Sequence, residues 1–134
     1  MNEVSEYLRK SGVQYFATVG TDGKPKVRPF SFMLEEGGKL FFCTSNRKPV
    51  FSEMSSQPNV EVCCMGENSS WLRLRGKAVF VKDLGLKEKI QNASPTVKGI
   101  YKTPDNPVFE AFYISDAEAV ISDFSGNPPR TIRL

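Results

Sequence analysis

The sequence contains no histidine among its 134 residues. The absence of an imidazole excludes a Ser-His or Cys-His catalytic pair, a histidine-ligated haem and the ordinary histidine-bearing zinc site. Acid–base chemistry would therefore rest on Asp, Glu, Lys, Tyr or Cys, or else the demanding chemistry belongs to an organic cofactor. We favour an organic cofactor and predict no metal site.

Cysteine and long apolar runs are also scarce. Cys43, Cys63 and Cys64 form neither a CxxC pair nor an even disulfide set, which favours a reducing compartment and buried, inert thiols. The longest strongly apolar stretches, residues 40–43 and 60–65, fall far below the roughly 18 residues that cross a bilayer. The polar N-terminal segment is unlike a signal peptide. We therefore expect a cytoplasmic protein without a membrane partner.

Motifs that cradle nucleotide phosphates are missing too, since neither GxxxxGK nor GxGxxG occurs. The formal net charge is only +3, and the 18 Lys and Arg residues are dispersed along the chain. This pattern predicts no nucleic-acid partner but permits a small anionic ligand. With 40% hydrophobic and 25% charged residues, we expect one globular domain over residues 1–134.

Capping and composition signals divide the chain into short elements. Asn2 and Asp83 are placed to cap helices, and Pro49 suits a first helical turn. We predict helices over residues 2–10, 49–57 and 84–92, and a short one that opens at 94–95. We predict strands over residues 13–20, 25–34, 39–44, 60–65, 71–81, 108–114 and 119–123.

Turn signals suggest how these strands connect. Residues 20–24 and 35–38 join the first three strands, which predicts an antiparallel meander. Residues 101–107 are loop-like and residues 126–130 irregular. Several short strands at regular spacing indicate a mainly β fold with peripheral helices, and we favour a barrel over a sandwich.

The first candidate binding segment is residues 44–48, with the sequence TSNRK, between a strand end and a helix start. Two hydroxyls, an amide, two cations and free backbone N–H groups in one turn suit a phosphate group. The alternative is a solvated helix cap with two surface cations, which is a common arrangement. Composition alone does not decide between them.

Two strand segments are further candidates. The sequence RPFSF at residues 28–32 places a proline within a strand, which argues for an edge or unpaired position where a flat ligand can lie. The alternative is an ordinary edge strand with both phenylalanines in the core. Trp71, Arg73 and Arg75 alternate and so share one face, suited to a phosphorylated ring or a nucleic acid. Their alternative is a polar outer face with one packed Trp.

The order of these motifs resembles the pyridoxamine 5'-phosphate oxidase-like family of FMN-binding split barrels. The matching positions are GTDGKP at residues 20–25, RP at 28–29, CT at 43–44, SNRK at 45–48 and PN at 58–59. The resemblance covers residues 11–81 and weakens beyond them; it rests on order and spacing. It implies an antiparallel, Greek-key-like split β-barrel that holds FMN between the two subunits of a homodimer.

The resemblance also implies which residues hold the cofactor. The strand from residue 28 lines the flavin ring, largely through backbone groups, and the turn at 44–48 holds the phosphate with two cations. Trp71 lies on a strand that approaches the cofactor, where the oxidase carries a polar residue. The implied set is Arg28, Pro29, Phe30, Ser31, Phe32, Cys43, Thr44, Ser45, Asn46, Arg47, Lys48 and Trp71. Catalytic residues stay unassigned.

The chain departs from the oxidase at its end, where Ile132, Arg133 and Leu134 replace the Trp-Arg-Leu-type segment that holds the oxidase's substrate. Pyridoxamine phosphate is therefore not the expected substrate. The short chain is more similar to the branch of nitroimidazole-resistance proteins and general-stress flavoproteins, although it lacks the active-site histidine of some nitroimidazole-resistance members.

Three functions are compatible with the sequence. The favoured one is an FMN-dependent oxidoreductase that passes electrons from NADH or NADPH to a small electrophile such as a nitroaromatic. The second is a flavin-binding module without turnover. The third, a small basic barrel that binds single-stranded nucleic acid, is weaker because the basic residues are few and dispersed. Deazaflavin in place of FMN is a variant of the first.

Overall fold

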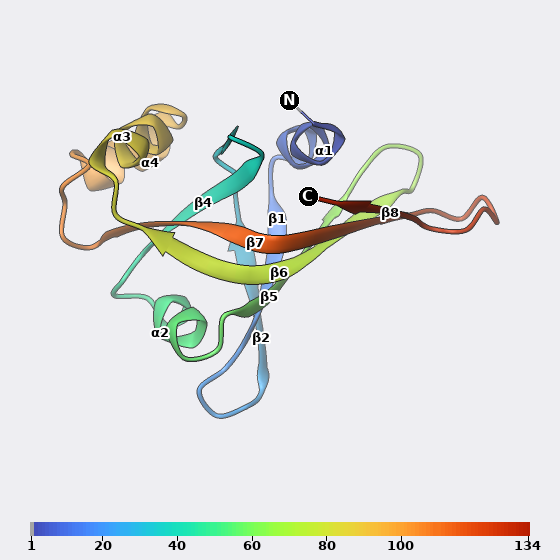
Figure 1. The fold of residues 1–134 in the computed structure, drawn as a ribbon, viewed down its shortest axis with the longest axis horizontal. Helices are drawn as coiled ribbons and strands as arrows, with labels where there is room; N and C mark the ends of the chain where they lie inside the picture. The colour runs from blue at the N-terminus through green and yellow to red at the C-terminus, as the bar shows by residue number, and fades with distance from the viewer. Residues whose placement is uncertain (1) are drawn as a thin grey trace.

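The computed structural model describes residues 2–134, which form four helices and eight strands (Figure 1). The helices are α1 (Glu3–Ser11), α2 (Pro49–Ser56), α3 (Leu84–Asn92) and α4 (Pro95–Tyr101). The strands are β1 (Gln14–Val19), β2 (Pro25–Phe30), β3 (Leu34–Glu36), β4 (Lys39–Ser45), β5 (Asn59–Met65), β6 (Trp71–Val81), β7 (Phe109–Ser122) and β8 (Arg130–Arg133).

Local capping chemistry begins and ends the helices at the predicted places. The Asn2 side chain accepts a hydrogen bond from Ser5 N at 2.8 Å, and the Asp83 side chain accepts one from Leu86 N at 2.9 Å. Gly12, with φ +73°, ends α1 in a conformation that favours glycine. The four predicted helices are confirmed, with boundaries shifted by one residue or so.

All strand pairs are antiparallel, in the order β2-β1-β5-β6-β7-β4-β3, with β8 added beside β7. Figure 1 shows α1 above β7, α2 below β6 and β7, and the α3–α4 pair beside the end of β6. The predicted mainly β fold with peripheral helices is confirmed.

The predicted meander of the first three strands is wrong. Among the described residues, β2 pairs with β1 alone, whereas β4 pairs with β3 and β7. The single strand expected over residues 25–34 divides into β2 and β3, because the chain leaves the sheet at residues 31–33. Gly37 and Gly38, with φ of +59° and +79°, form so short a turn that Glu35 and Glu36 already pair with β4.

The two strands expected over residues 108–114 and 119–123 are one long strand, β7. A register shift between Arg75 and Lys77 accommodates the interruption around Asp116, whose φ is +51°. Arg130, expected in the irregular tail, begins β8. The residues that were expected to separate two strands instead form a β-bulge, and β7 pairs with β6 on both sides of it.

Four phenylalanines hold the sheet in a curled shape. The ring centroids lie 4.6 Å apart for Phe16 and Phe30, 6.5 Å for Phe30 and Phe42, and 5.8 Å for Phe42 and Phe112. Phe30 belongs to the edge strand β2, and Phe42 to β4 near the opposite edge of the sheet. Because their rings meet in one core, the sheet closes on itself as an open barrel.

No helix within residues 2–134 combines the length and apolar character needed to cross a lipid bilayer.

Candidate cofactor site

Thr44 is the first element of the site. It lies near the end of β4, is only 3% exposed, and its Oγ1 has no hydrogen-bond partner among residues 2–134. A buried hydroxyl without a partner costs about 1–3 kcal/mol. Such a group in a folded protein calls for an explanation, and a bound polar ligand supplies one.

The helix that follows begins without a side-chain cap. Lys48 is the N-cap residue of α2; its backbone is extended and its side chain makes no capping hydrogen bond. Pro49 is the first helical residue, as predicted. The N-terminus of α2 carries the positive end of the helix dipole, which suits an anion. Most N–H groups here are engaged: Lys48 N donates to Ser45 O and Phe51 N to Lys48 O, each at 3.1 Å.

Two exposed cations flank this open helix end. Within the described part of the chain, the side chains of Arg47 and Lys48 take part in no ion pair or hydrogen bond. By contrast, the arginines on β2, β6 and β8 all form ion pairs with carboxylates. Ser45 Oγ accepts a hydrogen bond from Arg47 N at 3.2 Å, within the turn itself. Exposed, unpaired cations fit both a phosphate turn and the alternative of a solvated helix cap; the unpartnered Thr44 hydroxyl is the feature that favours a phosphate.

Asn46 anchors the turn to the neighbouring loop. Its Nδ2 donates to Pro107 O at 2.8 Å and to Glu110 Oε2 at 2.9 Å, and its backbone N donates to Val108 O at 2.9 Å. These bonds engage the side-chain amide with the protein. Asn46 thus positions residues 44–48 against the start of β7.

The second predicted segment, residues 28–32, passes close to β4. Met33 N donates to Phe41 O at 3.0 Å, and Phe32 N donates to the side chain of Gln14 at 2.6 Å. Pro29 and Ser31 are exposed, whereas Phe30 and Phe32 pack against the core. Residues 31–33 belong to no strand, and the bond from Met33 places their backbone beside β4, the strand that ends in the turn at residues 44–48. The predicted edge position of the proline is confirmed.

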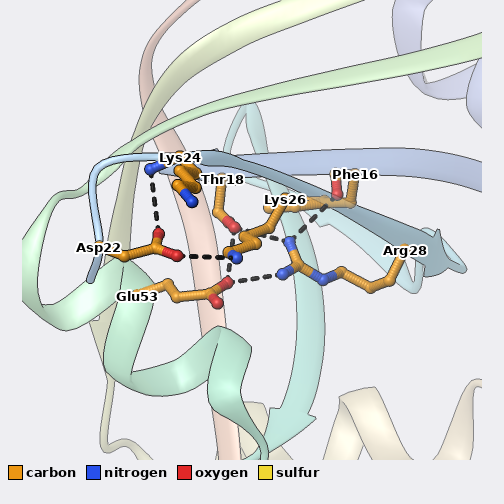
Figure 2. Close-up of polar contacts among 7 residues, drawn as sticks. All are labelled: Phe16, Thr18, Asp22, Lys24, Lys26, Arg28 and Glu53. Carbon is orange, nitrogen blue, oxygen red and sulfur yellow. Dashed lines mark hydrogen bonds and ion pairs between the residues drawn. The ribbon is translucent and has the colours of Figure 1, made fainter. Parts of the chain in front are cut away.

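The Arg28 side chain is engaged within the protein. Its Nη2 lies 2.5 Å from Glu53 Oε1, and its Nη1 donates to Thr18 Oγ1 at 2.7 Å and to Phe16 O at 3.2 Å. Figure 2 shows the guanidinium between β1 and α2, directed toward these partners. Arg28 therefore contributes its backbone, rather than a free cation, to any ligand beside residues 31–33.

Two other predicted residues lie apart from the turn. The Cys43 side chain packs in the cluster of Tyr101 and Phe109, on the strand face opposite Thr44, and burial raises its pKa to about 12. Trp71 packs on Phe124, with ring centroids 5.2 Å apart. Cys43 therefore reaches the turn through its backbone.

The position of Trp71 follows from strand register. Thr44 on β4 pairs with Glu110 on β7, and the next residue of β7 pairs with Val81 at the end of β6. The turn therefore lies near Val81, whereas Trp71 is ten residues earlier, at the start of β6. At about 3.3 Å a residue, Trp71 lies some 33 Å along the strand from the turn. Within one chain, Trp71 and the turn at 44–48 do not form one site.

Reasoning from sequence missed Glu53. It is 7% exposed and shares the buried face of α2 with Val50 and Met54, at helical spacing. A carboxylate among apolar residues at positions i, i+3 and i+4 is the signal that could have identified it. Its partner, Arg28, lies 25 residues away in the sequence.

Other features of the described residues do not compete with this site. No group of three or more Cys, Asp or Glu residues within 2–134 is placed to hold a metal ion. Arg73 pairs with Glu61 at 2.5 Å, and Arg75 with Glu118 at 2.6 Å. The face predicted for a nucleic acid is thus neutralised by carboxylates, as its polar-face alternative predicts.

Comparison with known proteins agrees with the geometry. A family model described as pyridoxamine 5'-phosphate oxidase matches residues 1–120. No curated protein sequence matches the chain. A NimC/NimA family protein from Clostridium acetobutylicum is 33% identical, with a TM-score of 0.88 over 96% of this chain and 89% of that protein.

Two more distant structures share the fold. General Stress Protein 26 from Bacillus anthracis is 22% identical, with a TM-score of 0.76 over 98% of this chain and 95% of that one. A pyridoxamine 5'-phosphate oxidase-related, FMN-binding protein from Nostoc punctiforme is 18% identical, with a TM-score of 0.66 over 96% and 86%. The split-barrel prediction is confirmed, and the chain belongs to the pyridoxamine 5'-phosphate oxidase family.

Proposed function

We propose that this protein binds FMN and passes electrons from NADH or NADPH to a small electrophile such as a nitroaromatic. The observation that carries the proposal is the unpartnered, buried Thr44 hydroxyl beside the open start of α2. The FMN-binding protein from Nostoc punctiforme and the NimC/NimA family protein support it as relatives in fold and family.

The residues of the turn fit a phosphate monoester. Thr44 Oγ1 is a donor, the positive end of the α2 dipole lies beside it, and Arg47 and Lys48 supply positive charge without competing partners among the described residues. Charge-assisted hydrogen bonds to phosphate are about twice as strong as neutral ones. The backbone of residues 31–33, which lies beside β4, would face the flavin ring.

Bound FMN would supply two-electron chemistry, accepting a hydride from the nicotinamide and reducing the acceptor. The chain's own contribution is to bind and orient the cofactor. The charged side chains at the turn are those of Arg47 and Lys48, together with the Glu110 carboxylate, which accepts a hydrogen bond from Asn46 Nδ2 at 2.9 Å. Because that carboxylate is engaged by Asn46, the site favours simple hydride chemistry on a range of acceptors over specific recognition of one substrate.

We propose further that the protein is a homodimer that completes the site. Trp71 reaches a turn at residues 44–48 only if that turn belongs to a second copy, because its own turn is far along β6. The outer face of β1 and β2 also leaves Tyr15 56% and Val27 67% exposed. A second copy would cover this apolar face.

The phosphate site is tested by comparing Lys48→Ala with Lys24→Ala. Lys24 is an exposed cation in the β1–β2 turn and does not belong to the proposed site at residues 44–48. Loss of a charge-assisted contact of about 1.5–3 kcal/mol should weaken FMN binding about 10- to 150-fold in the Lys48 variant only. Titration by flavin fluorescence quenching measures both, and equal affinities would show that the turn does not hold the phosphate.

Turnover is tested by anaerobic mixing of the FMN-loaded protein with NADH or NADPH. Either nucleotide should bleach the flavin absorbance, a nitroaromatic should restore it, and pyridoxamine phosphate should be turned over poorly. If neither nucleotide bleaches a flavin that chemical reductant does bleach, the protein is a flavin-binding module. The absorbance of the cofactor released on denaturation distinguishes FMN from deazaflavin.

A further inference from the structure

One ionic contact joins the two halves of the proposed cofactor site. Arg28 of β2 and Glu53 of α2 meet at 2.5 Å, and the Thr18 hydroxyl both accepts from Arg28 and donates to Glu53, each at 2.7 Å. Figure 2 shows the three side chains converging between the β1–β2 hairpin and α2. The guanidinium and the carboxylate thus contact each other directly and are also bridged by the Thr18 hydroxyl.

This pair differs from the other ion pairs of the chain in its burial. The side chains of Arg28 and Glu53 are 23% and 8% exposed, whereas those of Arg130 and Glu3 are 60% and 52% exposed. A buried pair keeps a single geometry, because either charge left alone in that position is costly. An exposed pair is weak and readily exchanged for water.

The two partners lie next to the two binding segments. Arg28 is on the strand that runs directly into residues 31–33, which would face the flavin ring. Glu53 is on the helix whose first turn follows directly on residues 44–48, which would hold the phosphate. The contact therefore ties the strand that leads into the ring segment to the helix that follows the phosphate turn, in addition to the backbone bond from Met33 N to Phe41 O.

Resting on the proposed FMN binding, we propose that Arg28 and Glu53 are positioning residues that determine the preference for phosphorylated over unphosphorylated flavin. Neither charge touches the ligand. The pair keeps the start of α2 at the distance at which one molecule fills both segments, so binding the phosphate requires no rearrangement. Without the pair, the ring segment and the Asn46 contacts of the turn remain, but α2 loses its tie to β2 and the start of the helix is held less firmly.

The test compares the affinities for FMN and riboflavin in wild type, Glu53→Gln and the double variant Arg28→Met/Glu53→Leu. The double variant replaces the pair by apolar side chains of similar size, an exchange that buried ion pairs commonly tolerate without unfolding. Glu3→Gln is the matched control, because Glu3 forms a Glu–Arg pair that joins α1 to β8. Circular dichroism melting of each variant reports its folding separately.

In both variants of the pair, the FMN-over-riboflavin preference should fall about tenfold or more, through loss of FMN affinity, with riboflavin affinity nearly unchanged. Glu3→Gln should retain the wild-type preference. If the affinities for FMN and riboflavin fall equally, or if the folded double variant keeps the wild-type preference, the positioning role is overturned. Wild type that binds neither flavin would instead overturn the proposed function itself.

Discussion

Replacing Thr44 by Val should change the stability of the free protein and its FMN affinity in opposite directions. The hydroxyl is buried and unpartnered among residues 2–134, so an isosteric methyl removes a desolvation cost of about 1–3 kcal/mol. The same change removes a donor to the phosphate, a contact to a charged group of about 1.5–3 kcal/mol. We expect a more stable free protein that binds FMN about 10- to 150-fold more weakly.

Unfolding by heat, with and without FMN at one fixed protein concentration, measures both effects. Without FMN, a gain of about 1 kcal/mol should raise Tm by about 4 °C in a chain of this size. At FMN near 100 times the wild-type Kd, binding adds about 2.7 kcal/mol to wild type. A variant with affinity about 20-fold weaker gains only about 1 kcal/mol at that concentration. The order of the two melting temperatures should therefore reverse when FMN is added.

Thr18→Val is the matched control, because the Thr18 hydroxyl is bonded to Arg28 and Glu53. Loss of that bonded hydroxyl should lower the stability of the free protein by about 1–3 kcal/mol. If Thr44→Val destabilises the free protein in the same way, the Thr44 hydroxyl is paired in solution and the reasoning is refuted. Unchanged FMN affinity in Thr44→Val would refute it as well.

Four further predictions concern the dimer, the cysteines and two glycines. Sedimentation at decreasing concentration, read at protein and flavin wavelengths, should show flavin on dimers and colourless monomers; flavin on a stable monomer would contradict the shared site. Alkylation of the folded protein at pH 8, read by mass spectrometry, should modify Cys63 before Cys43, because burial raises the pKa of Cys43 to about 12 and Cys63 is the less buried thiol. The raised Cys43 pKa also predicts a stability contribution that is complete below about pH 9 and lost as pH rises toward 12, since the unfolded thiol releases its proton first. Gly76→Ala should lower the free energy of unfolding by about 1–3 kcal/mol, because the added Cβ would collide with the Ser115 carbonyl oxygen. Gly99→Ala, with open space inside a helix, should raise it by about 0.5–1 kcal/mol. Urea titration compares the two variants, and equal effects would contradict the packing argument.

The sequence alone determined those features that depend on neighbouring residues. Asn2, Asp83 and Pro49 begin helices where their side-chain chemistry predicts, because a cap or a fixed φ acts within one turn. The strand at Trp71–Val81 has the predicted bounds, since its composition and its flanking polar segments are local signals. The order of turn, strand and cationic loop sufficed to identify the family.

Strand neighbours and charge partners were decided by the tertiary structure. Period-2 alternation tells which face of a strand is buried but not which strand lies beside it, so β4 was expected next to β2 and instead pairs with β7. The ion pair of Arg28 was not predicted, because its carboxylate partner, Glu53, is 25 residues away on a helix. Trp71 was grouped with the turn at 44–48, yet the length of β6 separates them within one chain. Each of these depends on which distant segments meet when the barrel closes around Phe16, Phe30, Phe42 and Phe112, and burial of that common core, rather than any local preference, fixes their positions.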